Sequence, residues 1–424
     1  MLLLFQCYQI VKPLCFHVFR ITFASNYYNM KRFLLSLGLC LALSTQAQII
    51  VPSLSKGIVF ESEDNSFKAQ LGFRIQNLVT LELPNNRTDL KANALVRRAR
   101  LKLDGHVFNP KWVYKFEMGL SNRDIGARSD YEQSNSASKM ILDAVVKYQA
   151  HRNLEIWFGQ TKLPGNRERV NSSQKLQFVD RSLVNSYYNI DRDMGVQLHY
   201  NTAIKNVPIK AAASMSLGEG RNITGGNYGG FNYTGRVEVL PFGEFTKGGD
   251  YFSADLAREQ KPKLSIGATY DLNMDASRQG GQLNDFVTDT LGNAFYRDLN
   301  TLFVDMIFKY KGFSAMAEYA DKKSDSRIND GAINTKLNFR TGTGITFQAG
   351  YLFKNNLEVA ARYTSISADA TSSLTDINEY TLALSKYVVG HTVKVQSDFG
   401  ISQNPNALNA DPIPEIRFQV EVGF

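Results

Sequence analysis

The sequence contains very little cysteine. Its three cysteines, Cys7, Cys15 and Cys40, all lie near the start of a chain of 424 residues. Residues 48–424 therefore hold no thiol, and no disulfide can stabilise them. For an exported chain, this absence fits a large structure that closes on itself through backbone hydrogen bonds better than a small secreted domain.

Long apolar runs and common catalytic motifs are also missing. After residue 48 no run of 18 apolar residues occurs, which excludes helical membrane spans from this part of the chain. The sequence has no G-x-S-x-G motif, no cluster of His and Cys, and no Asp-rich calcium loop. The few histidines after residue 47 have no evident nucleophile to activate. We therefore expect no enzyme, no metal and no other cofactor.

The charge balance does not indicate a nucleic-acid partner. Of the 48 basic residues, four lie in residues 1–47, which hold no acid, so that 44 basic residues face 40 acidic ones in the rest of the chain. No basic helical stripe accompanies this near balance, so we expect no binding to nucleic acid.

Residues 30–47 have the order of a secretory signal peptide. Lys31 and Arg32 come first, an apolar run from Phe33 to Leu43 follows, and small residues lead up to Ala47. We expect cleavage after Ala47. Residues 1–29 are then an upstream extension from a start codon assigned too early. An N-terminal anchor is the alternative, but the apolar run is too short to span a bilayer.

The stretch RRARLKLDG, residues 97–105, alternates as a strand does. One face carries Arg98, Arg100 and Lys102, and the other carries Ala99, Leu101 and Leu103. Because successive side chains of a strand point to opposite faces of the sheet, this strand separates an apolar phase from a wet one. Taken alone, the stretch also fits a half-buried strand of a soluble sandwich.

The same alternation recurs to the last residue. Each alternating segment is about ten residues long, the length that a tilted strand needs to cross a bilayer. We count sixteen predicted strands, over residues 67–82, 95–108, 111–120, 139–150, 153–161, 193–201, 207–217, 231–241, 262–272, 299–311, 312–321, 343–353, 357–367, 377–388, 391–401 and 415–424.

The connections between these strands differ in length. They are mostly short after even-numbered strands and mostly long and polar after odd-numbered ones, which is typical of an outer-membrane barrel and not of a sandwich. The connection 242–261 breaks this rule, so the strands over 231–272 stay uncertain. We predict an all-β fold, a transmembrane antiparallel β-barrel of about 16 strands over residues 67–424, with long extracellular loops and short periplasmic turns. A short periplasmic segment, residues 48–66, precedes it.

Three segments resemble the phosphate-selective porin O and P family of Gram-negative outer membranes. They are RRARLKLDGHVFNPKWVYKFEMGL, LEIWFGQTKLPGNRERVNSSQKLQFVDRSLVNSYYNIDRDMGVQLHY and GHTVKVQSDFG. The resemblance implies a porin in outer-membrane lipid, assembled as a homotrimer, with a basic lumen and an inward-folding loop near 162–192. The terminal Phe424 also resembles the assembly signal that the barrel-assembly machinery reads.

The alternation and the resemblance together indicate a pathway for small anionic solutes such as phosphate. Arg binds such anions with a planar fork and Lys acts as a point charge. The candidate residues are Arg74, Arg98, Arg100, Lys102 and Lys115 on strands, and Arg167, Arg169, Lys175 and Arg181 in the loop. These cations could instead pair with lumen acids. A general or weakly selective porin, or a receptor or adhesin barrel that transports nothing, therefore remains an alternative.

We predict that the mature protein begins at Gln48, because small residues occupy the positions just before the expected cleavage site. N-terminal sequencing of the protein isolated from outer membranes should give Gln48 as the first residue. Recovery of residues 1–29 from the same material would contradict the prediction.

Overall fold

The computed structural model describes residues 48–50, 57–82, 90–125, 139–223, 230–288, 295–325, 338–406 and 412–424. The chain divides into two units, 1–48 and 49–424, and the fold described below is that of the second unit. The predicted signal peptide over 30–47 and the upstream extension over 1–29 lie outside the described residues. None of the described helices is long and apolar enough to cross a bilayer.

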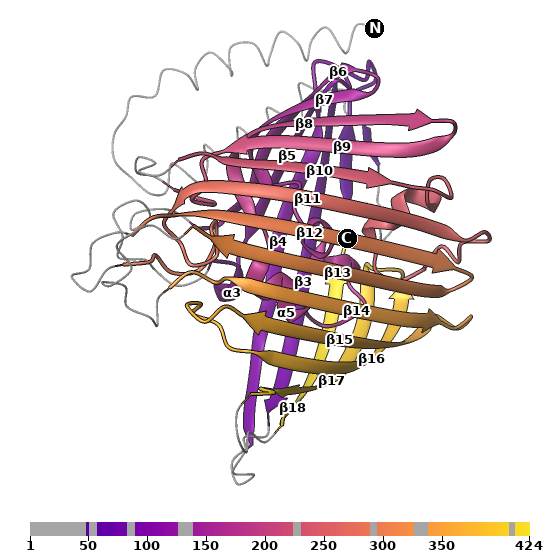
Figure 1. Cartoon of the computed structure of the whole chain (residues 1–424). Coiled ribbons are helices and arrows are strands. Elements are labelled where there is room, and N and C mark those ends of the chain that lie inside the picture. Colours follow the sequence, from indigo (N-terminus) through magenta and orange to yellow (C-terminus); the bar gives the residue numbers. More distant parts are fainter. Residues whose placement is uncertain are drawn as a thin grey trace, which may run out of the picture. The chain divides into compact units, whose positions relative to one another are not determined.

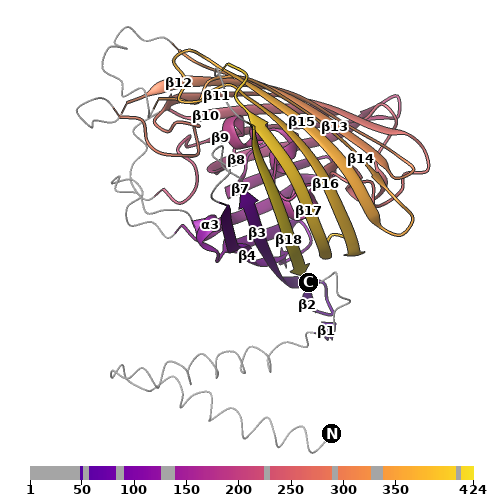
Figure 2. The same cartoon turned by 90° about the horizontal axis from the view of Figure 1, so that it is seen from below.

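Within the described residues, sixteen antiparallel strands, β3 to β18, form a closed barrel. Each strand pairs with its neighbours in sequence, and the last strand pairs with β3 to close the barrel. Figure 2 shows β18 and β3 side by side at this seam. The prediction of an all-β barrel of sixteen strands is confirmed, and every predicted strand overlaps an observed one.

The colours of Figure 1 follow the strands in sequence order around the barrel. Two short strands precede it, β1 (Gln48–Ile50) and β2 (Ile58–Glu61), and β2 pairs with the first residues of β3. The barrel strands are β3 (Phe67–Glu82), β4 (Lys91–Val107), β5 (Trp112–Gly119), β6 (Ile141–His151), β7 (Leu154–Lys162), β8 (Arg192–Ile204), β9 (Val207–Ser216), β10 (Asn232–Val239), β11 (Lys263–Ala276), β12 (Arg297–Tyr310), β13 (Phe313–Ser324), β14 (Gly342–Leu352), β15 (Leu357–Ala368), β16 (Ile377–Val389), β17 (Val393–Gln403) and β18 (Ile413–Gly423). The short helices are α3 (Asn122–Ile125), α4 (Arg167–Val170), η1 (Ser173–Lys175), α5 (Leu183–Tyr188) and η2 (Thr246–Tyr251).

The alternation of each strand decides which side chains face outward. In β10, Tyr233 and Val237 are exposed on the outside, whereas Thr234, Arg236 and Glu238 are buried inside. A closed barrel has no strand edge, so its backbone groups pair with one another and the strands can cross lipid. The sequence pattern therefore produces a barrel with an apolar outer surface and a polar interior.

At one end of the barrel the connections are short, as Figure 1 shows on its right side. The exception is the connection 240–262, which joins β10 to β11. These two strands pair directly, from Asn232 opposite Asn273 to Val239 opposite Ile266. No strand lies between them, which resolves the uncertainty over residues 231–272, and the additional residues fold into the barrel instead.

Strand β4 contains a β-bulge at Arg97. Its register with β3 skips Arg97, because Arg98 and Val96 pair with consecutive residues of β3. A bulge inserts one residue into a strand and redirects its side chain. Strict alternation would turn Arg97 away from the lumen, whereas its guanidinium in fact lies 2.9 Å from Asp180 inside the barrel.

Residues 163–191, called the lumen loop below, connect β7 to β8 and pack against the inner wall of the barrel. The loop carries α4, η1 and α5. Val184 and Tyr188 of α5 are fully buried against wall residues that include Phe303 and Ile366. Burial of these apolar groups holds the loop against β12 and β15 and fills this part of the lumen.

Gln177 fixes the middle of the lumen loop to the same side of the barrel. Its amide nitrogen donates to Ser314 Oγ and to Glu358 Oε1, both at 2.7 Å, and its side-chain oxygen accepts from Gln348 Nε2 at 3.0 Å. Its backbone oxygen accepts from Gln396 Nε2 at 2.9 Å. One residue thus satisfies polar groups of β13, β14, β15 and β17.

Arg167 anchors the start of the lumen loop in a buried cluster of charges. Its side chain has no exposed surface, its Nε lies 2.6 Å from Asp305 and its Nη2 lies 3.1 Å from Glu238. Its Nη1 donates to the Asp250 backbone oxygen at 3.1 Å. Arg236 pairs with the same two carboxylates, at 2.6 and 2.7 Å. The loop is therefore tied to β10 and β12.

We predict that Arg167→Met lowers the free energy of unfolding by roughly 3–5 kcal/mol, because removing one partner leaves buried carboxylates without full compensation. The midpoint of urea denaturation of the refolded barrel measures this loss. Arg169→Met is the matched control, since Arg169 lies on the same helix but is partly exposed and, among the described residues, forms an ion pair only with Asp191. An equal loss in the two variants would contradict the anchoring role of Arg167.

Candidate functional site

A cavity of about 640 Å³ lies in the lumen between the lumen loop and the wall formed by β3 to β10. The lumen loop, Tyr251 and Phe424 complete its lining, and none of the described residues of β11 to β17 contributes. Three acidic residues line it, Glu117, Glu155 and Glu238. Ten basic residues line it, namely Arg74, Arg100, Lys102, Lys115, Lys147, Lys162, Lys175, Arg192, Lys210 and Arg236.

The basic row of β4 divides between this cavity and the lumen loop. Arg100 and Lys102 line the cavity, and Lys102 keeps 48% of its side chain exposed. Arg98 does not line it. The Arg98 guanidinium is buried, donates to Gln76 Oε1 at 2.5 Å and lies 3.1 Å from Asp180 of the lumen loop.

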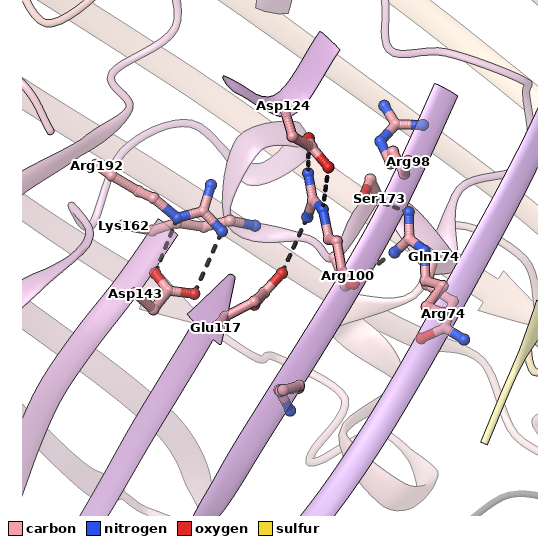
Figure 3. A network of polar contacts seen from close by, with 12 residues as sticks. Arg74, Arg98, Arg100, Glu117, Asp124, Asp143, Lys162, Ser173, Gln174 and Arg192 are labelled. Carbon is pink, nitrogen blue, oxygen red and sulfur yellow. Dashed lines mark hydrogen bonds and ion pairs between the residues drawn. The ribbon is translucent and has the colours of Figure 1, made fainter. Parts of the chain in front are cut away.

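Arg100 and Arg192 are held by buried carboxylates, as Figure 3 shows. Arg100 donates to both oxygens of Asp124, at 2.7 and 3.0 Å, and to Glu117 at 3.0 Å. Arg192 donates to both oxygens of Asp143, at 2.8 and 3.3 Å. Two hydrogen bonds from a planar guanidinium fix its orientation as well as its position.

Two of the cations are more exposed than the carboxylates that pair with them. The carboxylates have 0% exposure, whereas their partners keep 23% and 9%, in the pairs Asp143 with Lys115 and Glu421 with Arg74. A solute in the cavity therefore approaches the cation of each pair more closely than the carboxylate. Since Coulomb energy falls with distance, the cations dominate the field that such a solute meets.

Two lysines of the cavity contact aromatic rings. Lys147 Nζ lies 3.5 Å from the ring centre of Trp157, which stacks on His199 at 3.9 Å. Lys175 Nζ lies 3.7 Å from the ring centre of Phe252. Among the described residues, neither ammonium has a carboxylate at ion-pair distance. Burial, and next the charge of Lys102, lower the pKa of Lys175.

Two arginines of the lumen loop bind the loop itself. Arg169 pairs with Asp191. Arg181 donates to the backbone oxygens of Glu168 and Asn171, each at 2.7 Å. Both side chains therefore close the loop on itself and hold its shape.

The same two arginines lie close to further cations. The pKa of Arg181 is lowered to about 10, mainly by burial and in part by the charges of Arg100 and Arg192. Burial, and next the charges of Arg181 and Arg192, hold the pKa of Arg169 well below its usual range. Nearby like charges have this effect because they disfavour the protonated form. The lumen loop thus places Arg169 and Arg181 close to Arg100 of β4 and Arg192 of β8.

Asp180 attaches the loop to the bulge of β4. Burial alone would raise the pKa of Asp180, but the charges of Arg97 and Arg98 outweigh burial and hold the pKa below its usual range. The backbone oxygen of Asp180 also accepts from Arg362 Nη1 at 3.0 Å. A charged Asp180 therefore connects two sides of the barrel through the loop.

The structure brings five of the nine predicted pathway residues to the cavity and the other four to the loop contacts. Arg74, Arg100, Lys102, Lys115 and Lys175 line the cavity, whereas Arg98, Arg167, Arg169 and Arg181 do not. The sequence did not identify Lys147, Lys162, Arg192 and Lys210, which also line it. Each of these stands alone on its strand or at a strand end, and only the register of all the strands together brings them to one cavity.

The described residues include no group of His, Cys, Asp and Glu that could hold a metal ion. The chemistry that this cavity offers is electrostatic. Fixed cations on the wall of a lumen lower the barrier for anions, and conduction requires that each site binds weakly enough to release them.

Comparison with known proteins identifies the family. The model of the phosphate-selective porin O and P family matches residues 69–402. No curated protein sequence matches the chain.

Solved structures with a similar fold include the outer membrane channel DcaP of Acinetobacter baumannii, with a TM-score of 0.50 and 12% identity over 87% of this chain and 100% of that chain. An anion-selective porin from Comamonas acidovorans has a TM-score of 0.49 and 13% identity, over 84% and 100% of the two chains. The trimer form of in-vitro folded OmpT from Vibrio cholerae has a TM-score of 0.47 and 10% identity, over 85% and 100%.

At these identities the structural likeness concerns the fold alone. The family model, in contrast, matches most of the barrel, and the resemblance seen in the sequence is confirmed. The chain belongs to the phosphate-selective porin O and P family and is a porin of the Gram-negative outer membrane.

Proposed function

We propose that this porin passes small anionic solutes by passive diffusion, along the basic cavity of its lumen. The observation that carries the proposal is the lining of the cavity, where ten Lys and Arg face three Glu. The solute enters near Arg100 and Arg192, where the lumen loop meets the wall. It then follows the lysines toward the short turns. No energy source is needed, because the solute moves down its gradient.

The lysines near aromatic rings are the strongest contributors in this proposal. Lys147 and Lys175 contact Trp157 and Phe252. A cation over a ring is attracted only weakly, and the ring adds no opposing net charge. Their charge therefore remains available to a solute, whereas the charge of Arg100 is largely offset by Asp124 and Glu117. Phosphate is one solute of this class, and the proposal covers small carboxylates equally.

A general or weakly selective porin is the second candidate. It is favoured by the ion pairs, since most of the arginines of the lumen have a carboxylate partner. The receptor or adhesin alternative gains nothing from these contacts. A basic cavity inside the lumen serves conduction and not the binding of a partner at the cell surface. Selectivity measurements distinguish an anion-conducting porin from a general porin.

Membership of the family also supports assembly as a homotrimer in outer-membrane lipid, after insertion by the barrel-assembly machinery. Phe424 lies where the barrel closes: its backbone nitrogen donates to the Phe73 oxygen at 3.0 Å and its oxygen accepts from the Phe73 nitrogen at 3.2 Å. A signal at this position would report that the final strand is present. Gel migration of unheated protein measures the number of copies.

We predict that the triple variant Lys102→Gln, Lys147→Gln and Lys175→Gln folds and loses anion preference. The anion-to-cation permeability ratio should fall by roughly fivefold or more, since each unit charge about 4 Å from an ion in water is worth ~1 kcal/mol. The reversal potential in a tenfold salt gradient measures this ratio. The effect should be largest at low salt, because the screening length is about 30 Å at 0.01 M and about 3 Å at 1 M.

The matched control changes three exposed lysines near the short turns, Lys111, Lys261 and Lys354, to Gln. It removes the same charge outside the cavity and should leave the reversal potential unchanged. A folded cavity variant with the selectivity of the unmodified porin would overturn the proposal and favour a general porin.

A further inference from the structure

The connection 240–262, called the turn-side strap below, is an inward-folded element at the end of the barrel opposite the long loops. The other described connections at this end, such as 152–153, 205–206 and 311–312, are tight turns. The strap includes η2, and its residues from Gly249 to Asp255 are buried or partly buried. A chain segment buried in this way needs partners for its backbone groups.

The wall of the barrel supplies those partners. Lys309 of β12, whose ammonium is buried, donates to the backbone oxygens of Gly249 and Ala254, both at 2.7 Å. Asp255 of the strap accepts from the backbone nitrogen of Gly312 at 2.7 Å. Two carbonyl oxygens of the strap accept from this buried cation, which fixes the position of the strap along the barrel axis.

Apolar contacts hold both ends of the strap. Leu240 and Phe245 pack in one buried cluster with Ile307 and Met316 of the wall. Ala254 packs in a second cluster with wall residues of β14 and β16. Residues that point into the lumen of a barrel are usually polar. The apolar wall residues found here pack against the strap and are not part of a surface for a polar solute.

The strap also contacts the lumen loop. The backbone nitrogen of Ser253 donates to the Lys175 oxygen at 3.0 Å, and the Phe252 ring lies under the Lys175 ammonium. Arg167 of the loop donates to the Asp250 oxygen. The two inward-folded segments are thus joined, one from each end of the barrel. Together they occupy the side of the lumen that faces β11 to β17.

This arrangement explains why the cavity is one-sided. It is lined by β3 to β10 and by Tyr251 of the strap, and no described residue of β11 to β17 reaches it. Tyr251 donates to Glu238 at 3.1 Å, and Lys210 lies 2.8 Å from Asp250, so the strap borders the cavity through two polar contacts with β9 and β10.

We propose that the turn-side strap is a second constriction of this porin and sets its upper size limit for solutes. The lumen loop narrows the pore from the long-loop end, and the strap narrows it from the turn end. The proposal concerns the open cross-section, so it is independent of anion preference and can be tested with uncharged solutes.

The first test uses Lys309→Met, which removes the ammonium that holds two strap carbonyls and replaces no residue that lines the cavity. Swelling of liposomes in uncharged sugars of increasing size, and single-channel conductance, are measured. We expect a shift of the size limit to larger sugars and a roughly twofold rise in conductance, as the part of the lumen that the strap occupies opens to ions.

The matched control is Lys322→Met. Lys322 is also buried on the inner wall and also donates to a backbone oxygen, that of Gly280 at 2.8 Å, but in the connection between β11 and β12 at the other end. This control should keep the original size limit. A folded Lys309→Met barrel with unchanged size limit and conductance would overturn the proposal.

The second test does not require a buried residue to be removed. Residues 48–424 contain no cysteine, so single cysteines can be introduced without background. The Tyr251→Cys variant should react with a small charged thiol reagent added to the open pore, and the reaction should reduce conductance. The Phe245→Cys variant, altered at a position buried against the wall, should not react. Reaction of the Tyr251→Cys variant without any change in conductance would show that the strap does not border the path, and would contradict the proposal.

Discussion

The structure depends on the requirement that every backbone hydrogen-bonding group inside a bilayer has a partner within the protein. Lipid offers none, so a sheet can cross it only when its first and last strands pair. Here β18 pairs with β3 from Glu415 opposite Glu82 to Gly423 opposite Arg74. Once the sheet is closed, alternation leaves one face of every strand to lipid and the other to a polar lumen.

That lumen then has to be filled or hydrated, and this porin does both. On the side of β11 to β17, the lumen loop and the turn-side strap replace water with protein. Gln177 and Arg167 show how the buried polar groups there are matched, since each satisfies groups from several strands. On the side of β3 to β10 the lumen stays open, and its wall carries cations. The proposed conduction path therefore runs through the open, basic side of the lumen, and the filled side supports the two inward-folded segments.

The fold could be predicted from the sequence because alternation is a local property that every strand displays. The site could be predicted only in part. Arg100 and Lys102 follow from the same alternation. Arg167 was assigned to the pathway because its segment resembles the inward-folding loop of the family. Its burial in a charge cluster could not be predicted, because its partners Asp305 and Glu238 are more than 70 residues away in sequence. Lys147 and Lys210 were missed because a single cation on a strand has no pattern of its own. The strap was visible only as a connection of unexpected length.

The bulge at Arg97 separates strand β4 into two parts with opposite phase. Toward the short turns, even-numbered residues such as Arg98 and Arg100 point inward. Beyond the bulge, the even-numbered Val96 is exposed on the outside, opposite Asn77 of β3. The extra residue thus uncouples the two halves of the strand, and each half can match its own surroundings. Deletion of Arg97 would leave Val96 next to Arg98 in unbroken alternation, with the lipid and lumen faces of both halves unchanged. A deletion elsewhere in β4 would instead exchange the two faces of the residues between it and the bulge, so the bulge is the one point of the strand where a change of length leaves the faces in place.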